Sequence, residues 1–303
     1  MLNLHLKGTS IRTLAHRHTV GIRTAYRWIV EELKAIPHNN QFTHDYCNRK
    51  RFCGALVADG KHVKVKGYAR KIPFLYGMDY TTHDLPCCIL TSSESFEAWT
   101  QFFIKLKNMD YPLVSLTCDD NPAIKQAAQY VFPNVIVQIC HVHFLENIRK
   151  QFKVRTYENY VSFFNDIRKH IFDVPMLGKD RLEARIRWRS PKHQDDNVKI
   201  AVMNYIFTHA EELTAYVNAQ NWYKVPCPKT TNIIESLNSQ LEGRLKTIQG
   251  FESFHTAERW LSAWILRKRF TPFTDCRKPF KKLNGKPSIE NTRRGKVKLP
   301  HLF

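Results

Sequence analysis

The chain has 303 residues, of which 43% are hydrophobic and 12% aromatic, and this composition excludes a mostly disordered protein. No apolar run approaches the roughly 20 residues that a membrane-spanning helix needs, so we expect no membrane partner. The sequence holds 47 Lys and Arg residues against 27 Asp and Glu residues, and the resulting formal net charge of +20 favours nucleic acid as the binding partner.

Residues 1–36 predict two short helices joined by a tight turn, because apolar residues recur at helical spacing over 11–15 and 22–33 with a break at 19–21. A helix-turn-helix of this kind inserts its second helix into the major groove of DNA. The side chains that the second helix would present there are Arg23, Thr24, Tyr26 and Arg27. An ordinary helical hairpin is the alternative interpretation, and the basic outer face favours DNA binding.

A polar linker spans residues 37–53, and strand-like patterns begin at residue 54. An apolar run over 55–58 ends at Asp59-Gly60, and residues 62–66 then alternate as a strand does. Further strands are predicted over 73–79, 86–90, 113–117 and 135–139, with helical spacing over 96–106 and 122–131. The order β-β-β-α-β-α-β over residues 54–143 predicts an α/β fold with a mixed sheet.

Helical patterns replace the strands over residues 144–225, with helices predicted over 157–172 and 198–217, and we interpret this region as an all-α insertion. Residues 226–270 predict two more helices, 231–245 and 254–268, that close the α/β domain. Residues 271–303 form a basic tail that we expect to be loosely ordered and able to grip phosphates. Its cations after Cys276 are Arg277, Lys278, Lys281, Lys282, Lys286, Arg293, Arg294, Lys296 and Lys298.

Three carboxylates stand at unusual places in this pattern. Asp59 and Asp119 each directly follow a predicted strand, and Glu235 lies near the start of a predicted helix. Ligand sites of such sheets gather at strand ends, so these three side chains are expected to converge. Hard oxygen ligands suit Mg²⁺, and two such ions roughly 4 Å apart activate a water or a DNA 3′-hydroxyl. Because Asp-Gly is also a common turn pair, the spacing alone leaves a structural role equally open.

Four segments of the chain carry a resemblance to one protein family. They are 57–65 with Asp59, 116–124 with Asp119, 132–144 with a Cys140-x-x-His143 pair, and 230–238 with Glu235. The two Asp residues are 60 positions apart (119 − 59), and 116 positions (235 − 119) separate the second from the Glu. In motifs, order and spacing, the chain from about Ser10 to Phe270 resembles the DDE transposases of the Mutator-like superfamily, which includes many bacterial insertion-sequence transposases.

The resemblance implies a ribonuclease H-like domain with an all-α insertion, preceded by a helix-turn-helix. It implies that Asp59, Asp119 and Glu235 are catalytic and hold Mg²⁺, with Mn²⁺ as the substitute ion, for cleavage and transfer of DNA strands. The substrates are then double-stranded element ends with terminal inverted repeats and a target DNA, bound by a homo-oligomer at the nucleoid in the bacterial cytoplasm. Family spacing selects Asp119 over Asp120, although Asp120 stands where Gly is common and either shares the metal or competes for it.

Cys140 and His143 form the pair that the resemblance singles out, and His143 is expected to contact the scissile phosphate or to orient Asp119. Zinc is not expected, since no Cys-x-x-Cys pair accompanies these residues. Eight Cys without the spacing of a disulfide scaffold, and a start that lacks the apolar segment of a signal peptide, favour a reducing compartment.

Two other functions stay open from the sequence. The first is a catalytically decayed or regulatory DNA-binding protein derived from a transposase, which the abrupt start inside a helical region favours and the intact carboxylates oppose. An N-terminally shortened copy is part of that alternative. The second is a metal-dependent nuclease that hydrolyses DNA without joining it.

Overall fold

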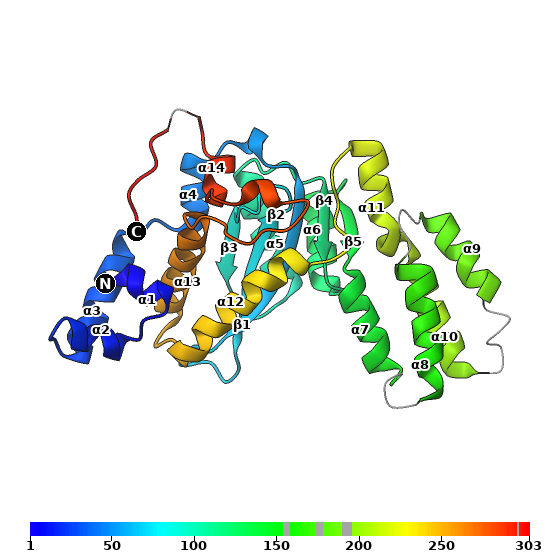
Figure 1. Cartoon of the computed structure of the whole chain (residues 1–303), viewed down its shortest axis with the longest axis horizontal. Helices are drawn as coiled ribbons and strands as arrows, with labels where there is room; N and C mark the ends of the chain where they lie inside the picture. Colours follow the sequence, from blue (N-terminus) through cyan, green and yellow to red (C-terminus); the bar gives the residue numbers. More distant parts are fainter. Residues whose placement is uncertain (154–157, 174–177, 190–195, 296) are drawn as a thin grey trace.

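A computed structural model of the chain describes residues 1–153, 158–173, 178–189, 196–295 and 297–303. Tyr157, the start of one predicted helix, and Lys296 of the basic segment lie outside these residues. A central sheet separates the N-terminal helices from a group of helices at the other end of the molecule (Figure 1). Among the described residues, no helix is long and apolar enough to cross a membrane.

The sheet has five strands in the order β3-β2-β1-β4-β5. Strand β1 (Ala55–Val63) pairs antiparallel with β2 (Ile72–Asp79), which pairs antiparallel with β3 (Cys87–Leu90). On its other side, β1 pairs parallel with β4 (Ser115–Cys118), which in turn pairs parallel with β5 (Ile136–Ile139). The predicted α/β class with a mixed sheet is therefore confirmed.

The sequence prediction that a strand ends at Asp59 is wrong. Strand β1 continues to Val63, because its pairing with β2 extends from Leu56↔Asp79 to Val63↔Ile72. Its pairing with β4 is much shorter and stops at Val57↔Thr117. Asp59 thus lies in mid-strand, at the level where the neighbouring strand has ended and the sheet edge is open.

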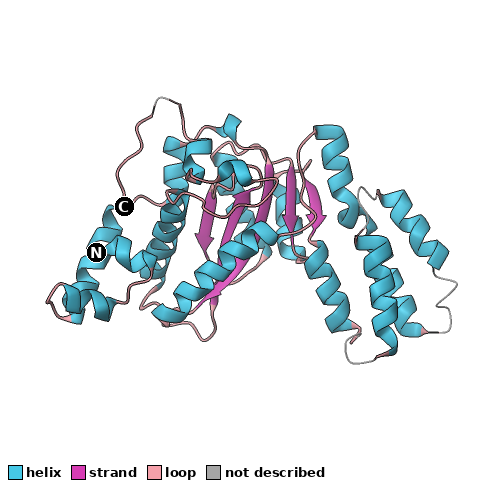
Figure 2. Cartoon of the chain, in the orientation of Figure 1, coloured by secondary structure: helices cyan, strands magenta, loops and turns pink. Residues whose placement is uncertain are grey.

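Helices α5 (Phe96–Asn108) and α6 (Pro122–Val131) pack against each other, and α5 also contacts β2 and β3. Helix α12 (Asn232–Ile248) lies across the sheet and contacts β1 and β2 (Figure 2). Helix α13 (Phe254–Arg269) contacts β3. Buried aromatic side chains of α5 and α13, such as Trp99, Phe102 and Trp264, belong to the same apolar core as the sheet.

The N-terminal helices are α1 (Leu2–Lys7), α2 (Ile11–Arg17), α3 (Ile22–Ala35) and α4 (Asn39–Tyr46). Helix α2 is capped by Ser10, whose hydroxyl accepts a hydrogen bond from the Thr13 backbone N–H. In the turn before α3, Thr19 takes a positive φ of 52°. Helices α1 and α3 both pack on α13, so this unit is docked on the body of the molecule.

Between β5 and α12, the described residues form helices and no strand. These helices are α7 (His141–Gln151), α8 (Asn159–Ile167), a π-helix (Arg168–Phe172), α9 (Lys179–Arg189), α10 (Asn197–Thr208) and α11 (Ala210–Tyr223). They share a second apolar cluster that includes Phe144, Ile167 and Ile206. Because α11 also packs along β5, the helical group is attached to the edge of the sheet.

The expectation of a loosely ordered C-terminal segment is wrong for residues 281–292. A 3₁₀ turn (Lys281–Leu283) and helix α14 (Ser288–Thr292) fold onto the body. The reason is a buried ion pair, in which Arg269 Nη2 lies 2.8 Å from Asp84 Oδ2. The hydroxyl groups of Ser288 and Thr292 donate to the same carboxylate at 2.8 and 2.5 Å. Helix α14 therefore supplies the remaining hydrogen bonds of the buried Asp84.

Candidate active site

Asp59 is partly buried where β1 passes beyond the end of β4. Its carboxylate accepts hydrogen bonds from the Gly60 backbone N–H at 2.7 Å and from Asn238 Nδ2 at 2.5 Å. Burial nevertheless raises the pKa of Asp59 to about 6, and the charges of Glu235 and Asp119 raise it further against these hydrogen bonds. The three predicted carboxylates therefore act on one another electrostatically.

Asp119 directly follows β4 and stands beside a fourth carboxylate, Glu94. Burial raises the pKa of Asp119, and the charge of Glu94 raises it further, while the nearby His143 lowers it. Trp99 Nε1 and Asn121 Nδ2 hold Glu94 in place, with donor–acceptor distances of 3.3 and 3.0 Å. Glu94 precedes α5 and belongs to none of the motifs that the sequence analysis identified.

Glu235 lies in the first turn of α12, and its Oε1 is 3.3 Å from His143 Nε2 at the start of α7. The hydrogen bond from His143 lowers the pKa of Glu235 against the effect of burial. In turn, Cys140 and Glu235 raise the pKa of His143 to about 10, so this imidazole is a cation at neutral pH. The positive charge on His143 offsets part of the repulsion among the carboxylates.

Cys140 is buried at the end of β5, where its Sγ accepts hydrogen bonds from the backbone N–H and the hydroxyl of Thr231, both at 3.3 Å. Burial raises the pKa of the Cys140 thiol, but hydrogen bonding to His143 and Thr231 outweighs burial and lowers it. These contacts join the start of α7 to the start of α12. The Cys140–His143 pair thus sets the position of Glu235 relative to the sheet.

Asn238 ends the segment 230–238 that contains Glu235, and the structure gives it contacts to two of the carboxylates. Its amide nitrogen donates to Asp59 and, at 3.4 Å, to Glu235 Oε2. Its amide oxygen accepts a hydrogen bond from the buried Tyr76 hydroxyl of β2. Because the hydroxyl fixes the orientation of the amide, Asn238 keeps a donor aimed between the two acids.

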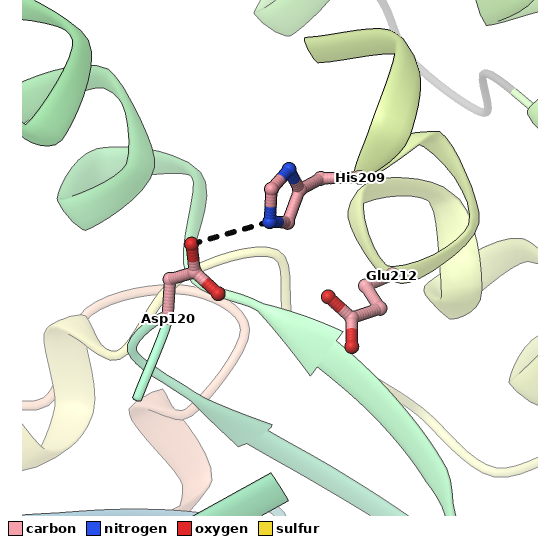
Figure 3. A group of neighbouring side chains, drawn as sticks. All are labelled: Asp120, His209 and Glu212. Carbon is pink, nitrogen blue, oxygen red and sulfur yellow. Dashed lines mark ion pairs between the residues drawn. The ribbon is translucent and has the colours of Figure 1, made fainter. Parts of the chain in front are cut away.

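Asp120 faces away from this group and toward the helical insertion. Figure 3 shows Asp120 with His209 and Glu212, whose potential ligand atoms all lie within 4.8 Å of one another. The Lys125 ammonium is 2.7 Å from Asp120 Oδ1 and 2.8 Å from Glu212 Oε2. Tyr205 also donates to Asp120 at 2.9 Å. Since a lysine already supplies the positive charge, we interpret this cluster as a structural link between α6 and helices α10 and α11.

Asp59, Asp119 and Glu235 do not form such a tight set, because the group in Figure 3 is the sole one found within 4.8 Å among the described residues. A site for two ions does not require such a tight set, since carboxylates that bind different ions need not touch. The donor set is made of hard oxygens; burial is the main cause of the raised pKa of Asp59, and a cation would offset the smaller contribution from the charges of Glu235 and Asp119. The residues present therefore fit divalent cations such as Mg²⁺.

The predicted DNA-contact residues lie on α3. Arg23 and Arg27 are exposed, whereas Thr24 and Tyr26 are half-buried. Arg23 and Tyr26 also line a cavity of about 460 Å³ between α3 and the segment that joins α12 to α13. The structure thus leaves the two arginines accessible and places Tyr26 closer to the body of the molecule.

Comparison with known proteins identifies the family of this chain. The sequence model described as "Transposase, Mutator family" matches residues 79–269, which is more than half of the chain. The chain belongs to the Mutator family of transposases. The match includes Asp119, His143 and Glu235, while Asp59 precedes it.

Curated relatives of this Mutator-family chain are transposases of bacterial insertion sequences. Transposases of the element IS256 in transposon Tn4001, from Staphylococcus aureus and Enterococcus faecalis, are 31% identical over 184 residues, covering 59% of this chain and 44% of theirs. The transposase of ISRM5 from Rhizobium meliloti is 23% identical over 249 residues, covering 73% of this chain and 57% of that relative. The chain therefore spans about half the length of the curated relatives it matches.

Among solved structures, a chain of a simian T-cell lymphotropic virus intasome complex aligns over 68% of this Mutator-family chain and 67% of its own length. The TM-score of 0.27 and the identity of 13% do not establish a common fold.

Proposed function

We propose that this chain is a DDE-type DNA transposase that cleaves DNA strands at element ends and transfers them to a target. The observation that carries the proposal is the placement of Asp59 on β1, Asp119 directly after β4 and Glu235 on α12, with Asp119 and Glu235 both near enough for their charges to raise the pKa of Asp59. Three carboxylates brought together repel one another, even in a chain of net charge +20. Cations bound for phosphodiester chemistry would offset that repulsion. Membership of the Mutator family supports the same reaction class.

We assign the sheet and its helices to the ribonuclease H-like fold. The support is the strand order β3-β2-β1-β4-β5, with three antiparallel strands followed by two strands parallel to β1. In this topology the centre of β1 and the end of β4 lie side by side. Residues 144–225 then constitute an insertion into that fold, and residues 226–270 complete it.

Asp59, Asp119 and Glu235 would hold two divalent cations, Mg²⁺ or Mn²⁺, which activate a water or a 3′-hydroxyl and stabilise the leaving oxygen. The protein's own residues prepare this site. Asn238 orients Asp59 and Glu235, and the His143 cation holds Glu235 in place. Because Nε2 of His143 pairs with Glu235 and its Nδ1 is buried, we assign His143 to orienting Glu235 and not to contacting the phosphate.

The DNA partners follow from the same proposal. Arg23 and Arg27, with Thr24 and Tyr26, would bind the terminal inverted repeats through α3. Synapsis of two element ends requires at least two copies of the catalytic site, so we propose a homo-oligomer on DNA.

A strand-transfer assay tests the proposal. Labelled duplex carrying the inverted repeats that flank the reading frame is mixed with supercoiled target plasmid and Mg²⁺. Wild type is compared with Glu235→Gln and with a matched control on the same helix, Glu242→Gln, whose carboxylate pairs with Lys61 at 2.7 Å outside the acidic group. We expect cleavage and joining by wild type and Glu242→Gln, and neither by Glu235→Gln.

Other outcomes separate the alternatives. Nicked DNA without joined products would identify a nuclease. Binding of the repeats without cleavage by wild type would favour the decayed or regulatory protein, and full activity of Glu235→Gln would remove Glu235 from the site.

A further inference from the structure

A second concave site lies on the other side of α12 from the carboxylates. It is a groove of about 920 Å³ between α12, the end of β2 and the segment 271–280. Glu235 points from α12 toward the sheet, whereas Asn232, Ser236 and Gln240 line the groove as one exposed stripe at a spacing of four residues. The groove and the acidic group therefore share one helix as a common wall.

The groove is strongly cationic. Four basic side chains line it, namely Lys229, Lys268, Arg277 and Lys278, and its single acidic lining residue is Asp275. Arg277 and Lys278 are exposed and form no ion pair with any described residue. Burial lowers the pKa of Lys268, and the charges of Arg267 and Arg244 lower it further. The positive charge of the exposed Arg277 and Lys278 is complementary to a polyanion.

The same groove offers surfaces for stacking. Tyr80, Phe273 and Phe280 are each half-buried and line it together with His83. Phe280 meets the Tyr80 ring edge-on at 5.1 Å between centroids and lies 4.3 Å from the His83 ring. The buried Nε2 of His83 has no hydrogen-bond partner among the described residues. Cations alternating with partly exposed aromatic rings are the usual elements of a surface that binds single-stranded nucleic acid.

We propose that this groove binds the phosphodiester backbone of a single DNA strand as that strand passes beside the carboxylates. This inference rests on the proposed transposase function and adds to it a strand-binding site and its residues. The volume resembles that of a pocket for a small ligand, so it accommodates a few nucleotides of one strand. The DNA strand then contacts the exposed stripe of Asn232, Ser236 and Gln240, on the side of α12 opposite Glu235.

The groove contains a natural reporter, because Cys276 lines it and its thiol is free. Full-length Glu235→Gln protein is treated with iodoacetamide, with and without a short single-stranded oligonucleotide, and alkylation is quantified by peptide mass mapping. We expect bound DNA to slow the alkylation of Cys276, in proportion to the fraction of protein bound. The half-buried Cys53, outside the groove, serves as an internal reference whose rate should not change.

Charge-reversal variants make the test specific. Arg277→Glu/Lys278→Glu removes two groove cations, and Lys281→Glu/Lys282→Glu makes the same charge change at exposed neighbours that do not line the groove. We expect the first pair to lower the slope of log affinity against log salt by about 1.4, since each lost single-strand phosphate contact accounts for ~0.7. The control pair should change the slope much less.

The outcomes distinguish this inference from the proposed function. DNA binding without protection of Cys276, or equal slope changes in both double variants, would overturn the groove while leaving the transposase proposal intact. Absence of binding to the single-stranded oligonucleotide alone would overturn the groove, and absence of binding to the duplex repeats as well, by wild type and by Glu235→Gln, would overturn both.

Discussion

Asp59 and Asp119 lie at the same distance beyond the last register pair of two neighbouring parallel strands, Asp59 within β1 and Asp119 directly after β4. The register pairs Val57 with Thr117, and each Asp follows two residues later. The two carboxylates therefore follow the paired part of the two strands at the same level along the sheet. Because β4 ends at Cys118 while β1 continues, the sheet is open at this level and accessible to a substrate.

The first prediction separates Asp119 from its neighbour. Asp119→Asn should abolish the rise in melting temperature that Mg²⁺ gives to wild type, because it removes a carboxylate from the proposed metal site. Asp120→Asn should keep that rise, although it weakens the ion pair with Lys125 and lowers the starting melting temperature. Thermal melts over a range of Mg²⁺ concentrations measure both effects. Loss of the Mg²⁺ response in Asp120→Asn alone would transfer the metal role to the cluster with Glu212.

The second prediction concerns Asn238. Its hydrogen bond favours the charged form of Asp59, so Asn238→Leu should raise the pKa of Asp59 above its value of about 6. A hydrogen bond to a charged group contributes about 1.5–3 kcal/mol, which corresponds to roughly one to two pH units. The acidic limb of the cleavage rate against pH should move upward by that amount. Ser239→Ala, on the exposed side of the same helix, is the control, and an unmoved limb in Asn238→Leu would contradict this role.

The third prediction concerns the buried pair of Arg269 and Asp84. Arg269→Met leaves the carboxylate buried without its charge partner, which typically costs about 3–5 kcal/mol. Urea unfolding followed by circular dichroism measures the loss. Arg267→Met, which removes a partly exposed guanidinium on the same helix, should cost far less. Equal losses in the two variants would show that the pair contributes nothing specific.

The fourth prediction concerns acid stability. Burial lowers the pKa of His141 from 6.5 to about 4, and the charge of Lys229 lowers it further against the hydrogen bond with the Leu213 carbonyl. As pH falls from 6.5 to 4, the unfolded chain takes up a proton that the folded chain excludes, so folding stability falls. This histidine alone accounts for about 3 kcal/mol of that fall.

Denaturant titrations at several pH values test this prediction. His141→Gln should lose less stability than wild type between pH 6.5 and pH 4, since the variant has no proton to exclude at this position. Parallel curves for wild type and variant would show that His141 is not the cause. The half-buried His83, whose pKa is also lowered to about 4 by burial, should produce a similar residual slope in the variant.

The sequence by itself determined which residues are candidates for the chemistry that we propose. The distance of 60 positions between Asp59 and Asp119 equals the offset of the register between β1 and β4, as in Ala55↔Ser115. Local patterns locate the two strands well, because hydrophobic periodicity and strand length depend on nearby residues alone. The motif around Glu235 was equally readable, since helix α12 has its own apolar stripe.

The tertiary structure alone decided how those residues are used. It placed Asp59 within a strand, turned Asp120 toward Lys125, and brought Glu94 and Asn238 into the acidic group. It also folded α14 onto the buried Asp84 and opened a cationic groove behind α12. These outcomes depend on charges and hydrogen bonds between residues far apart in the chain, and such contacts have no signature in local periodicity. They also depend on burial, which affects the pKa of each acid only after packing is complete.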